Sequence, residues 1–227
     1  MKLVLVVFLV VCGALLLLAN LSVVEAATRR KKKKVKPVKP SNVTCGSIIK
    51  LKHTNTNSRL HSHEIPYGSG SGQQSVTGYP RPSDSNSYWV VHGGYGTACR
   101  PGAPIANGAT VRFEHANTHA YLHSHKHLSP LTKQQEVSCY NGGADGGNTG
   151  DDWTVHFVGQ RVKHKHWSSH QQVLLQHVDT KFYLHSHQRT YGNPIPGQTE
   201  VTAFRSRNNN DNYWQVEEGI FFTDDNE

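Results

Sequence analysis

The chain has 227 residues, and its 24 Lys and Arg against 16 Asp and Glu give a formal net charge of +8. A chain of this length forms one ordinary domain or two small ones. Eight of the basic residues lie between Arg29 and Lys39, and after Pro40 fifteen basic residues balance fifteen acidic ones. The part that can fold is therefore neutral and has no basic stripe, which excludes a nucleic-acid-binding role.

The first 26 residues are arranged like a secretory signal peptide. An apolar run extends from Leu3 to Leu18, and Val24-Glu25-Ala26 provides the small residues of a cleavage site. We predict a signal peptide over residues 1–26. The alternative is an uncleaved anchor, because the segment from Leu3 to Val24 is long enough to span a bilayer. After cleavage we expect no membrane-spanning segment.

Residues 27–41 form a basic linker. A stretch rich in Lys and Pro has little apolar surface to bury, so we expect it to be disordered and extended. It acts either as a solvated spacer or as a patch for anionic partners. Asn42, directly after it, begins an Asn-Val-Thr sequon and is a candidate glycosylation site in an exported chain.

Three copies of one sequence unit follow, with an offset of 62 residues. Each copy has a His, then an Asn or Asp, ahead of the tetrapeptide Leu-His-Ser-His, and later a Trp in a short aromatic run. The first motifs run from His53 to His63, from His115 to His125 and from His177 to His187, and the tryptophans are Trp89, Trp153 and Trp214. We place the units at 42–96, 104–159 and 160–219, with a C-terminal tail at 220–227.

The units have the pattern of short β-strands. The runs Ser47–His53 and Thr110–His115 alternate apolar and polar residues, which is the period of a half-buried strand, and Val173–His177 holds the same place in the third unit. Each unit has room for four strands, and no helical period of useful length occurs. One unit is too small to bury a core, so three must close around a pseudo-three-fold axis. We predict an all-β fold, a β-trefoil, with the repeated Trp and Leu side chains in a shared core.

Several segments of the sequence resemble segments of a known protein family. They are Cys45–Thr54, Arg59–His63 and Tyr67–Gly78 in the first unit, and Ser129–Leu131, Gln135–Ser138 and Glu218–Phe221 in the later ones. These segments are similar to the MIR repeats of the stromal cell-derived factor 2 family. The resemblance implies a β-trefoil of three MIR repeats in the endoplasmic reticulum lumen. It also implies partnership with a lumenal J-domain co-chaperone and a BiP-type chaperone, with misfolded proteins as clients.

Two features depart from the pattern of that family. The chain ends at Thr223–Glu227 without the terminal Leu that a retention receptor needs. We therefore expect either residence in the endoplasmic reticulum lumen or secretion. The basic linker is also not a feature of the family, and it leaves an added anionic partner open.

The cysteines predict one disulfide bond. Cys12 belongs to the predicted signal peptide, which leaves Cys45, Cys99 and Cys139. An odd number in an oxidising compartment indicates one bridge and one free thiol. Cys45 precedes the first strand and Cys99 follows the first unit. Because a closed trefoil brings the start and the end of a unit together, we predict a Cys45–Cys99 disulfide and a free Cys139.

All sixteen histidines lie in the repeated part of the chain. The two histidines of each Leu-His-Ser-His point to one face of a strand, where they could share a metal ion. A repeat, however, triples any structural residue, and no set of Cys, His or carboxylate residues has the spacing of a closed metal site. We therefore predict structural histidines and no metal, and a pH-sensing role stays open.

One repeat position provides candidate ligand-binding residues for a glycan. They are His53 with Asn55, His115 with Asn117, and His177 with Asp179. The chain has no G-x-S-x-G, H-E-x-x-H or P-loop motif, so we predict no enzyme activity, no catalytic residue and no cofactor. Two functions remain. The resemblance implies a quality-control co-chaperone or adaptor, and the repeat position favours a secreted glycan-binding module.

Overall fold

The computed structural model describes residues 41–142, 146–159 and 165–223. The predicted signal peptide (1–26), the predicted linker up to residue 40 and residues 224–227 of the predicted tail lie outside the described residues. The strands are β1 Ile48–His53, β2 Arg59–Pro66, β3 Gln74–Tyr79, β4 Tyr88–Gly93, β5 Thr110–His115, β6 Tyr121–Leu128, β7 Gln135–Tyr140, β8 Trp153–Phe157, β9 Val173–His177, β10 Tyr183–Thr190, β11 Thr199–Phe204 and β12 Trp214–Ile220. Short 3-10 turns precede β4, β8 and β12: η1 Ser85–Ser87, η3 Thr149–Asp151 and η4 Asn210–Asn212.

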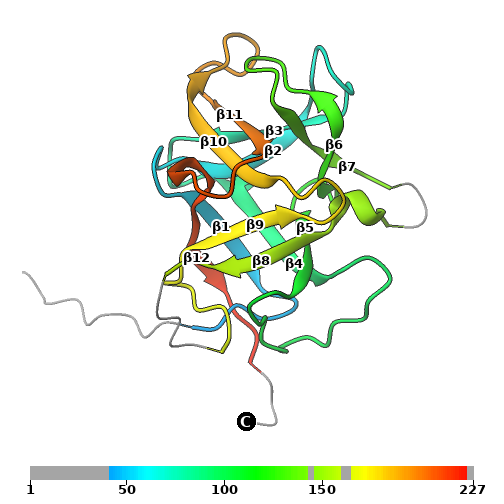
Figure 1. Ribbon diagram of the computed structural model, residues 1–227, viewed down its shortest axis with the longest axis vertical. Coiled ribbons are helices and arrows are strands. Elements are labelled where there is room, and N and C mark those ends of the chain that lie inside the picture. The colour runs from blue at the N-terminus through cyan, green and yellow to red at the C-terminus, as the bar shows by residue number, and fades with distance from the viewer. Residues whose placement is uncertain (1–40, 143–145, 160–164, 224–227) are drawn as a thin grey trace, which may run out of the picture. The chain divides into compact units, whose positions relative to one another are not determined.

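Six of the strands form a closed barrel in which every neighbouring pair is antiparallel. Its order is β1–β4–β5–β8–β9–β12 and back to β1. The other six form the hairpins β2–β3, β6–β7 and β10–β11, whose second strands pair with one another. Figure 1 shows the hairpins gathered at one end of the barrel. This architecture is a β-trefoil, so the predicted fold is confirmed.

The predicted shared core is also confirmed. Trp89, Trp153 and Trp214 are fully buried, and each indole Nε1–H donates to the carbonyl of the Leu in the Leu-His-Ser-His of its own unit, at 2.9, 2.9 and 3.0 Å. The predicted strands Thr110–His115 and Val173–His177 match β5 and β9, and β1 begins one residue after Ser47. Burying each Trp with its N–H paired satisfies the polar end of a large apolar side chain.

A second three-fold feature closes the other end of the barrel. Val43, Ile105 and Trp167, which are 62 residues apart in sequence, are buried there side by side. Their backbones form a ring of three hydrogen bonds: Val43 N–H donates to Trp167 O (2.7 Å), Trp167 N–H to Ile105 O (2.7 Å), and Ile105 N–H to Val43 O (3.0 Å). Residues 62 positions apart in sequence thus occupy equivalent places in the fold, outside the strands as well as within them.

The Cys45–Cys99 disulfide is present, with the two Cα atoms 6.0 Å apart. It joins the start of β1 to the segment that follows the first unit. Closing this loop of 54 residues stabilises the fold by about 4 kcal/mol in the chain-entropy description. Cys139 is a buried free thiol, and burial raises its pKa to about 12. It is therefore protonated and unsuited to act as a nucleophile.

Candidate functional site

The repeated histidines His53, His115 and His177, here called the junction histidines, are fully buried between units. Each ring packs against the repeated Trp of the preceding unit, with ring centroids 4.9, 5.1 and 5.0 Å apart. Nδ1 lies 2.8 or 2.9 Å from the hydroxyl of the Thr three residues later. Nε2 lies 2.9 Å from a backbone carbonyl in the 3-10 turn of the preceding unit. Each junction histidine therefore connects two units.

These bonds require the neutral form of the ring. The backbone N–H groups of Thr56 and Thr180 donate to Nδ1 of His53 and His177, at 3.2 and 3.3 Å. Nδ1 is thus an acceptor in these two rings, and the proton lies on Nε2, which donates to the carbonyl. Burial lowers the pKa of all three junction histidines, and that of His53 to about 4. No ring nitrogen is left for a ligand, so these residues have a structural role.

The other members of the predicted ligand set lie at the surface. Asn55, Asn117 and Asp179 are exposed, and each bonds to the 3-10 turn of the preceding unit. Asn55 Nδ2 donates to Asp211 Oδ1 (2.5 Å), Asn117 Nδ2 to Asn86 Oδ1 (2.5 Å), and Thr149 Oγ1 donates to Asp179 Oδ2 (3.1 Å). The structure therefore places the six predicted residues at three equivalent junctions, separated into buried histidines and surface Asn or Asp. The surface residues stay candidates for ligand contact.

The first histidine of each Leu-His-Ser-His fixes the 3-10 turn of its own unit. Its Nδ1 lies 2.7 Å from Asp84 Oδ2 in the first unit, 2.8 Å from Asp151 Oδ1 in the second and 2.8 Å from Asn212 Oδ1 in the third. The two histidines of one motif have ring centroids 5.1 to 5.7 Å apart. In the described part of the chain, no three His, Cys, Asp or Glu side chains are placed to hold one metal ion.

Two fully buried glutamates connect the second histidine of the motif to a loop of the preceding unit. Glu200 accepts from the backbone N–H of Leu131 (2.7 Å), from the N–H (3.1 Å) and hydroxyl (2.6 Å) of Thr132, and from His187 Nε2 (3.1 Å). Burial alone would raise the pKa of the Glu200 carboxyl group, but these hydrogen bonds hold it below its usual value.

Glu136 is held in the same way at the junction between the first and second units. It accepts from the N–H and hydroxyl of Ser71 and from His125 Nε2 (2.9 Å). Its pKa is also lowered, because hydrogen bonds from His125 and Ser71 outweigh the effect of burial. Gly70 makes this approach feasible: a Cβ atom there would lie 1.9 Å from Glu136 Oε2, and its φ of +71° favours glycine.

The third junction of this kind has no carboxylate. Ser75 stands in β3 at the place that Glu136 has in β7, and its hydroxyl donates to Ile65 O within its own hairpin (2.8 Å). The loop donors of the other two junctions, Ser71 and Thr132, each stand two residues before a Gln. Pro196 has the same place before Gln198. Proline offers neither an N–H nor a hydroxyl. The carboxylate and its loop donor are thus both missing, whereas the second histidine of the motif remains: Nε2 of His63 is buried without a hydrogen-bond partner among the described residues.

A groove of ≈ 370 Å³ lies beside the β1–β12 pair. Its lining includes Ile48, Ser85, Tyr88, Asn117, Glu218 and Ile220. Three strands align their outward side chains here in two rows, because β4, β1 and β12 are paired in register. One row is Tyr88–Lys50–Glu218 and the other is Val90–Ile48–Ile220.

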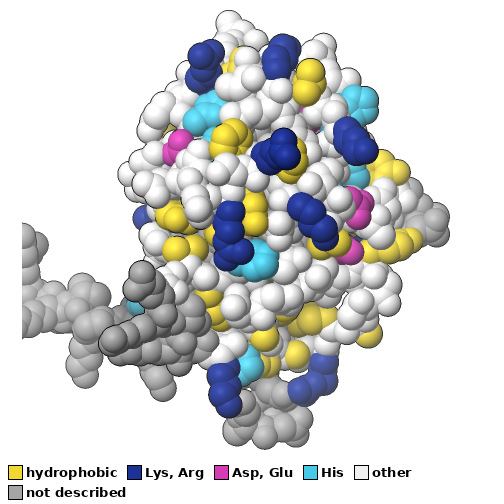
Figure 2. Space-filling view, in the orientation of Figure 1, with side chains coloured by type: hydrophobic (Ala, Val, Ile, Leu, Met, Phe, Trp, Pro, Cys, Tyr) yellow, Lys and Arg dark blue, Asp and Glu magenta, His cyan; other side chains and the backbone are white. Residues whose placement is uncertain are grey.

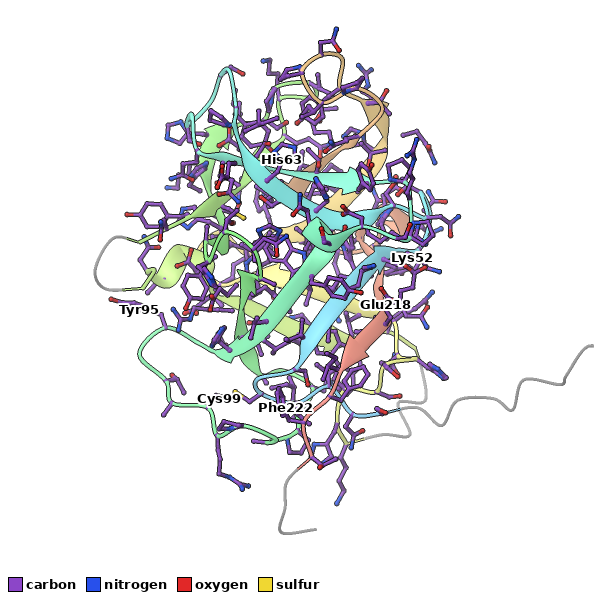
Figure 3. All side chains as sticks on the ribbon, turned by 180° about the vertical axis from the view of Figure 1, so that it is seen from behind. Lys52, His63, Tyr95, Cys99, Glu218 and Phe222 are labelled. Carbon is purple, nitrogen blue, oxygen red and sulfur yellow. A yellow bond between two sulfur atoms is a disulfide. The ribbon has the colours of Figure 1, made fainter. Side chains whose placement is uncertain are left out.

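The first row is a closed ionic cluster. The Lys50 amine is buried, and it contacts Glu218 Oε1 (2.5 Å), Pro82 O (2.6 Å) and the face of the Tyr88 ring (4.5 Å to the centroid). The Tyr88 hydroxyl donates to the same Oε1 (2.7 Å). The hydrogen bonds from Lys50 and Tyr88 lower the pKa of Glu218, whose side chain is 51% exposed. Figure 3 shows Glu218 and Lys52 at the same edge of the barrel.

Sequence reasoning did not identify Glu136, Glu200 or Glu218 as site residues. For Glu136 and Glu200 a sequence signal existed: each stands directly before the Val of the second strand of its hairpin, where the first unit has Ser75. For Glu218 no repeat signal exists, because the groove depends on strand pairing across the whole chain. Lys and Arg side chains are scattered over the face drawn in Figure 2 and form no stripe.

Asn42, the predicted glycosylation site, is exposed at the end of the barrel that Val43 closes. The hydroxyl of Thr44, the third residue of its sequon, lies 2.8 Å from Ser47 Oγ and donates to Phe222 O (2.8 Å). The asparagine side chain is thus at the surface, and glycosylation stays a prediction. Among the described residues, no helix is long and apolar enough to cross a membrane.

Comparison with known proteins agrees with this architecture. The MIR domain family matches residues 66–216. The chain is 47% identical to a stromal cell-derived factor 2-like protein of Dictyostelium discoideum, covering 80% of this chain and 85% of that protein. It is 47% identical to stromal cell-derived factor 2 of Homo sapiens, covering 79% and 82%.

Solved structures show the same likeness. The crystal structure of the SDF2-like protein from Arabidopsis thaliana superposes with a TM-score of 0.77 at 45% identity, covering 82% of this chain and 99% of that one. A yeast protein O-mannosyltransferase complex superposes with a TM-score of 0.73 at 32% identity, covering 84% of this chain and 27% of that one. The chain belongs to the stromal cell-derived factor 2 family of MIR-domain proteins.

Proposed function

We propose that this protein is a non-enzymatic quality-control adaptor of the secretory pathway. It resides in the endoplasmic reticulum lumen or is secreted, and it acts with a J-domain co-chaperone and a BiP-type chaperone on misfolded proteins. The observation that carries the proposal is membership of the stromal cell-derived factor 2 family, at 47% identity over 80% of the chain for the Dictyostelium relative. The Cys45–Cys99 disulfide supports an oxidising compartment.

The proposal is tested by proximity labelling with the full chain in the secretory pathway, followed by a crosslinked pull-down. We expect a J-domain protein and a BiP-type chaperone among the recovered partners, and endoplasmic reticulum residents among the labelled neighbours. Recovery of neither chaperone after crosslinking would contradict the adaptor role. Glycosidase treatment of the same material tests Asn42, and we expect a shift in mobility that Asn42→Gln abolishes.

A glycan-binding module is the second candidate function. It is favoured by the groove, where Asn117 of the predicted ligand set lies beside Ser85 and the aromatic ring of Tyr88. Polar side chains next to an aromatic face are suited to the hydroxyl groups and apolar face of a sugar. A glycan array without a hit for the wild-type protein would end this candidate.

A further inference from the structure

We propose that the groove beside β1 and β12 binds client polypeptides, and that it selects segments in which an aliphatic side chain lies next to a Lys or Arg. This inference rests on the proposed adaptor function and assigns its client contact to one surface. The groove provides Ile48, Ile220, the Tyr88 ring and the Glu218 carboxylate, and Val90 extends the aliphatic row beyond the groove as the register partner of Ile48.

The apolar part of the groove is open to a partner. Ile220 is 64% exposed, which is the largest exposed fraction among the exposed large hydrophobic residues of the described chain. Ile48 lies between Val90 and Ile220 in the paired strands, and both Ile48 and Val90 are partly exposed. A contiguous row of aliphatic side chains that is exposed on an outward sheet face marks a candidate interaction site.

The three-fold repeat does not account for this row. The residues 62 and 124 positions after Ile48 are Thr110 and Gln172, which are polar. β12 also continues as far as Ile220, opposite Ile48 in the register. The trefoil therefore forms without an apolar row at the other two equivalent places, so the row at the first is not needed for folding.

The charge of the groove indicates which charged side chain the partner should have. Of the described residues that line it, only Glu218 is charged. Lys50 balances this charge through its ion pair with Glu218 Oε1, but its amine is buried against Pro82 and the Tyr88 ring, so a ligand reaches the carboxylate and not the amine. Glu218 uses Oε1 for both Lys50 and Tyr88, and Oε2 makes no hydrogen bond within the described chain. A cation beside an apolar side chain complements this arrangement.

The neighbouring charges do not change this conclusion. Lys52 and Arg59, the other cations of this edge, both pair with Glu217: Lys52 Nζ lies 3.6 Å from Oε1, and Arg59 binds both carboxylate oxygens. The acceptor that remains exposed at the groove is therefore the carboxylate of Glu218.

The test uses the purified protein and fluorescein-labelled, end-blocked dodecapeptides that contain Leu-Lys pairs in a Gly/Ser background. A matched peptide has Glu in place of each Lys. We expect fluorescence anisotropy to show binding of the Lys peptide, with at least tenfold weaker binding of the Glu peptide. Ile220→Asp should weaken binding of the Lys peptide at least tenfold. Glu218→Gln, which keeps an acceptor for Lys50 and Tyr88, should remove most of the preference for Lys over Glu.

Leu128→Asp is the matched control, because Leu128 is 57% exposed on β6 and lies outside the groove lining. It should bind the Lys peptide as the wild type does. Equal loss of binding in Leu128→Asp and Ile220→Asp would overturn the proposal, as would equal affinity for the Lys and Glu peptides. A dimer that Ile220→Asp dissociates, or a glycan-array signal that Ile220→Asp abolishes, would assign the groove to another occupant and overturn it as well.

Pull-down of the chaperones from the same variants separates the two proposals. If Ile220→Asp loses the Lys peptide but still recovers the J-domain protein, the groove is the client site and the adaptor role stands. If the wild type recovers the chaperones while Ile220→Asp still binds the peptide, the groove proposal fails alone. If the wild type recovers no chaperone, the adaptor role fails, whatever the peptide result.

Discussion

Two of the three hairpin junctions contain a buried carboxylate, and the third contains a serine facing a proline. At the first two, Glu136 and Glu200 accept hydrogen bonds from a loop and from a histidine. At the third, Ser75 bonds within its own hairpin, and Pro196 has nothing to donate. His63, the counterpart of the histidines that pair with these glutamates, keeps its place, and its Nε2 is buried without a hydrogen-bond partner in the part of the chain that the structure describes. The comparison teaches that a repeat can lose a buried carboxylate together with its loop donor, and that the one nitrogen left unpaired is a cost the fold tolerates.

Acid should have the largest effect on the free energy of unfolding, because it acts on the junction histidines, which all three units have. The junction histidines have a lowered pKa in the folded state, and that of His53 is about 4 against 6.5 when unfolded. Below pH 6.5 the unfolded chain therefore binds more protons than the folded one, and stability falls as the pH decreases toward 4. His53 alone should cost about 3 kcal/mol over this range.

The two kinds of junction contact should respond in different pH ranges. The pKa of Glu136 and Glu200 is lowered from 4.5, so their contribution is complete above that value and is lost only as the pH falls below it. Urea unfolding at pH 7.5, 6.5, 5.5 and 4.5 measures the histidine range, and unfolding at pH 3.5 measures the glutamate range. His53→Gln, which does not titrate, should show a shallower slope. A free energy of unfolding that stays constant from pH 7 to 5 would contradict the neutral histidines.

Removing a junction carboxylate should be the next largest effect. Glu200→Ala leaves the N–H groups of Leu131 and Thr132 without their acceptor, and it should lower the free energy of unfolding by about 3–5 kcal/mol. Ser75→Ala is the control at the equivalent place and should cost about 1 kcal/mol. Urea denaturation at pH 7.5 measures both. Equal losses would show that the carboxylate contributes no more than the serine.

Introducing a carboxylate at the third junction should destabilise the fold, although two junctions of the wild type contain one. Ser75→Glu faces Pro196, which has no N–H, so within the described chain His63 Nε2 is the only donor left of the kind that the other two junctions provide. One donor does not replace the full set that a buried carboxylate needs, and we expect a loss of roughly 3 kcal/mol. Ser75→Glu combined with Pro196→Thr restores a donor and should recover at least about 1 kcal/mol. A double-mutant cycle by urea denaturation gives the coupling between the two sites. Strict additivity would show that donor and acceptor do not compensate for each other.

The smallest effect should come from a feature that is the same at all three junctions. Ser138 Oγ donates to Gln73 Oε1 and Thr202 Oγ1 to Gln134 Oε1, both at 2.6 Å, and Thr77 Oγ1 donates to Gln198 Oε1. Replacing any one of these glutamines by Ala should cost about 1 kcal/mol, with similar values at the three places. Thermal unfolding of the three variants checks this. A loss confined to one of them would show that the ring is not symmetric in energy.

Much of the fold could be predicted from the sequence. The offset of 62 residues, together with units too small to bury a core, predicted the trefoil, and the structure places Trp89, Trp153 and Trp214 in equivalent bonds. The Cys45–Cys99 bridge followed from the same closure. The site was harder to predict. The position of His53 was identified, but nothing in the sequence shows that both of its ring nitrogens are occupied, because one partner is the carbonyl of Asp211, 158 residues away.

The sequence by itself determined the number of units, the strand pattern and the residues that every unit must bury, since repeated residues occupy repeated places. Only the tertiary structure decided where the symmetry breaks. Glu218 and Ile220 lie opposite Lys50 and Ile48 because the last strand pairs with the first. Ring closure of this kind joins the two ends of a chain, and a local pattern contains no information about which side chains will then be neighbours.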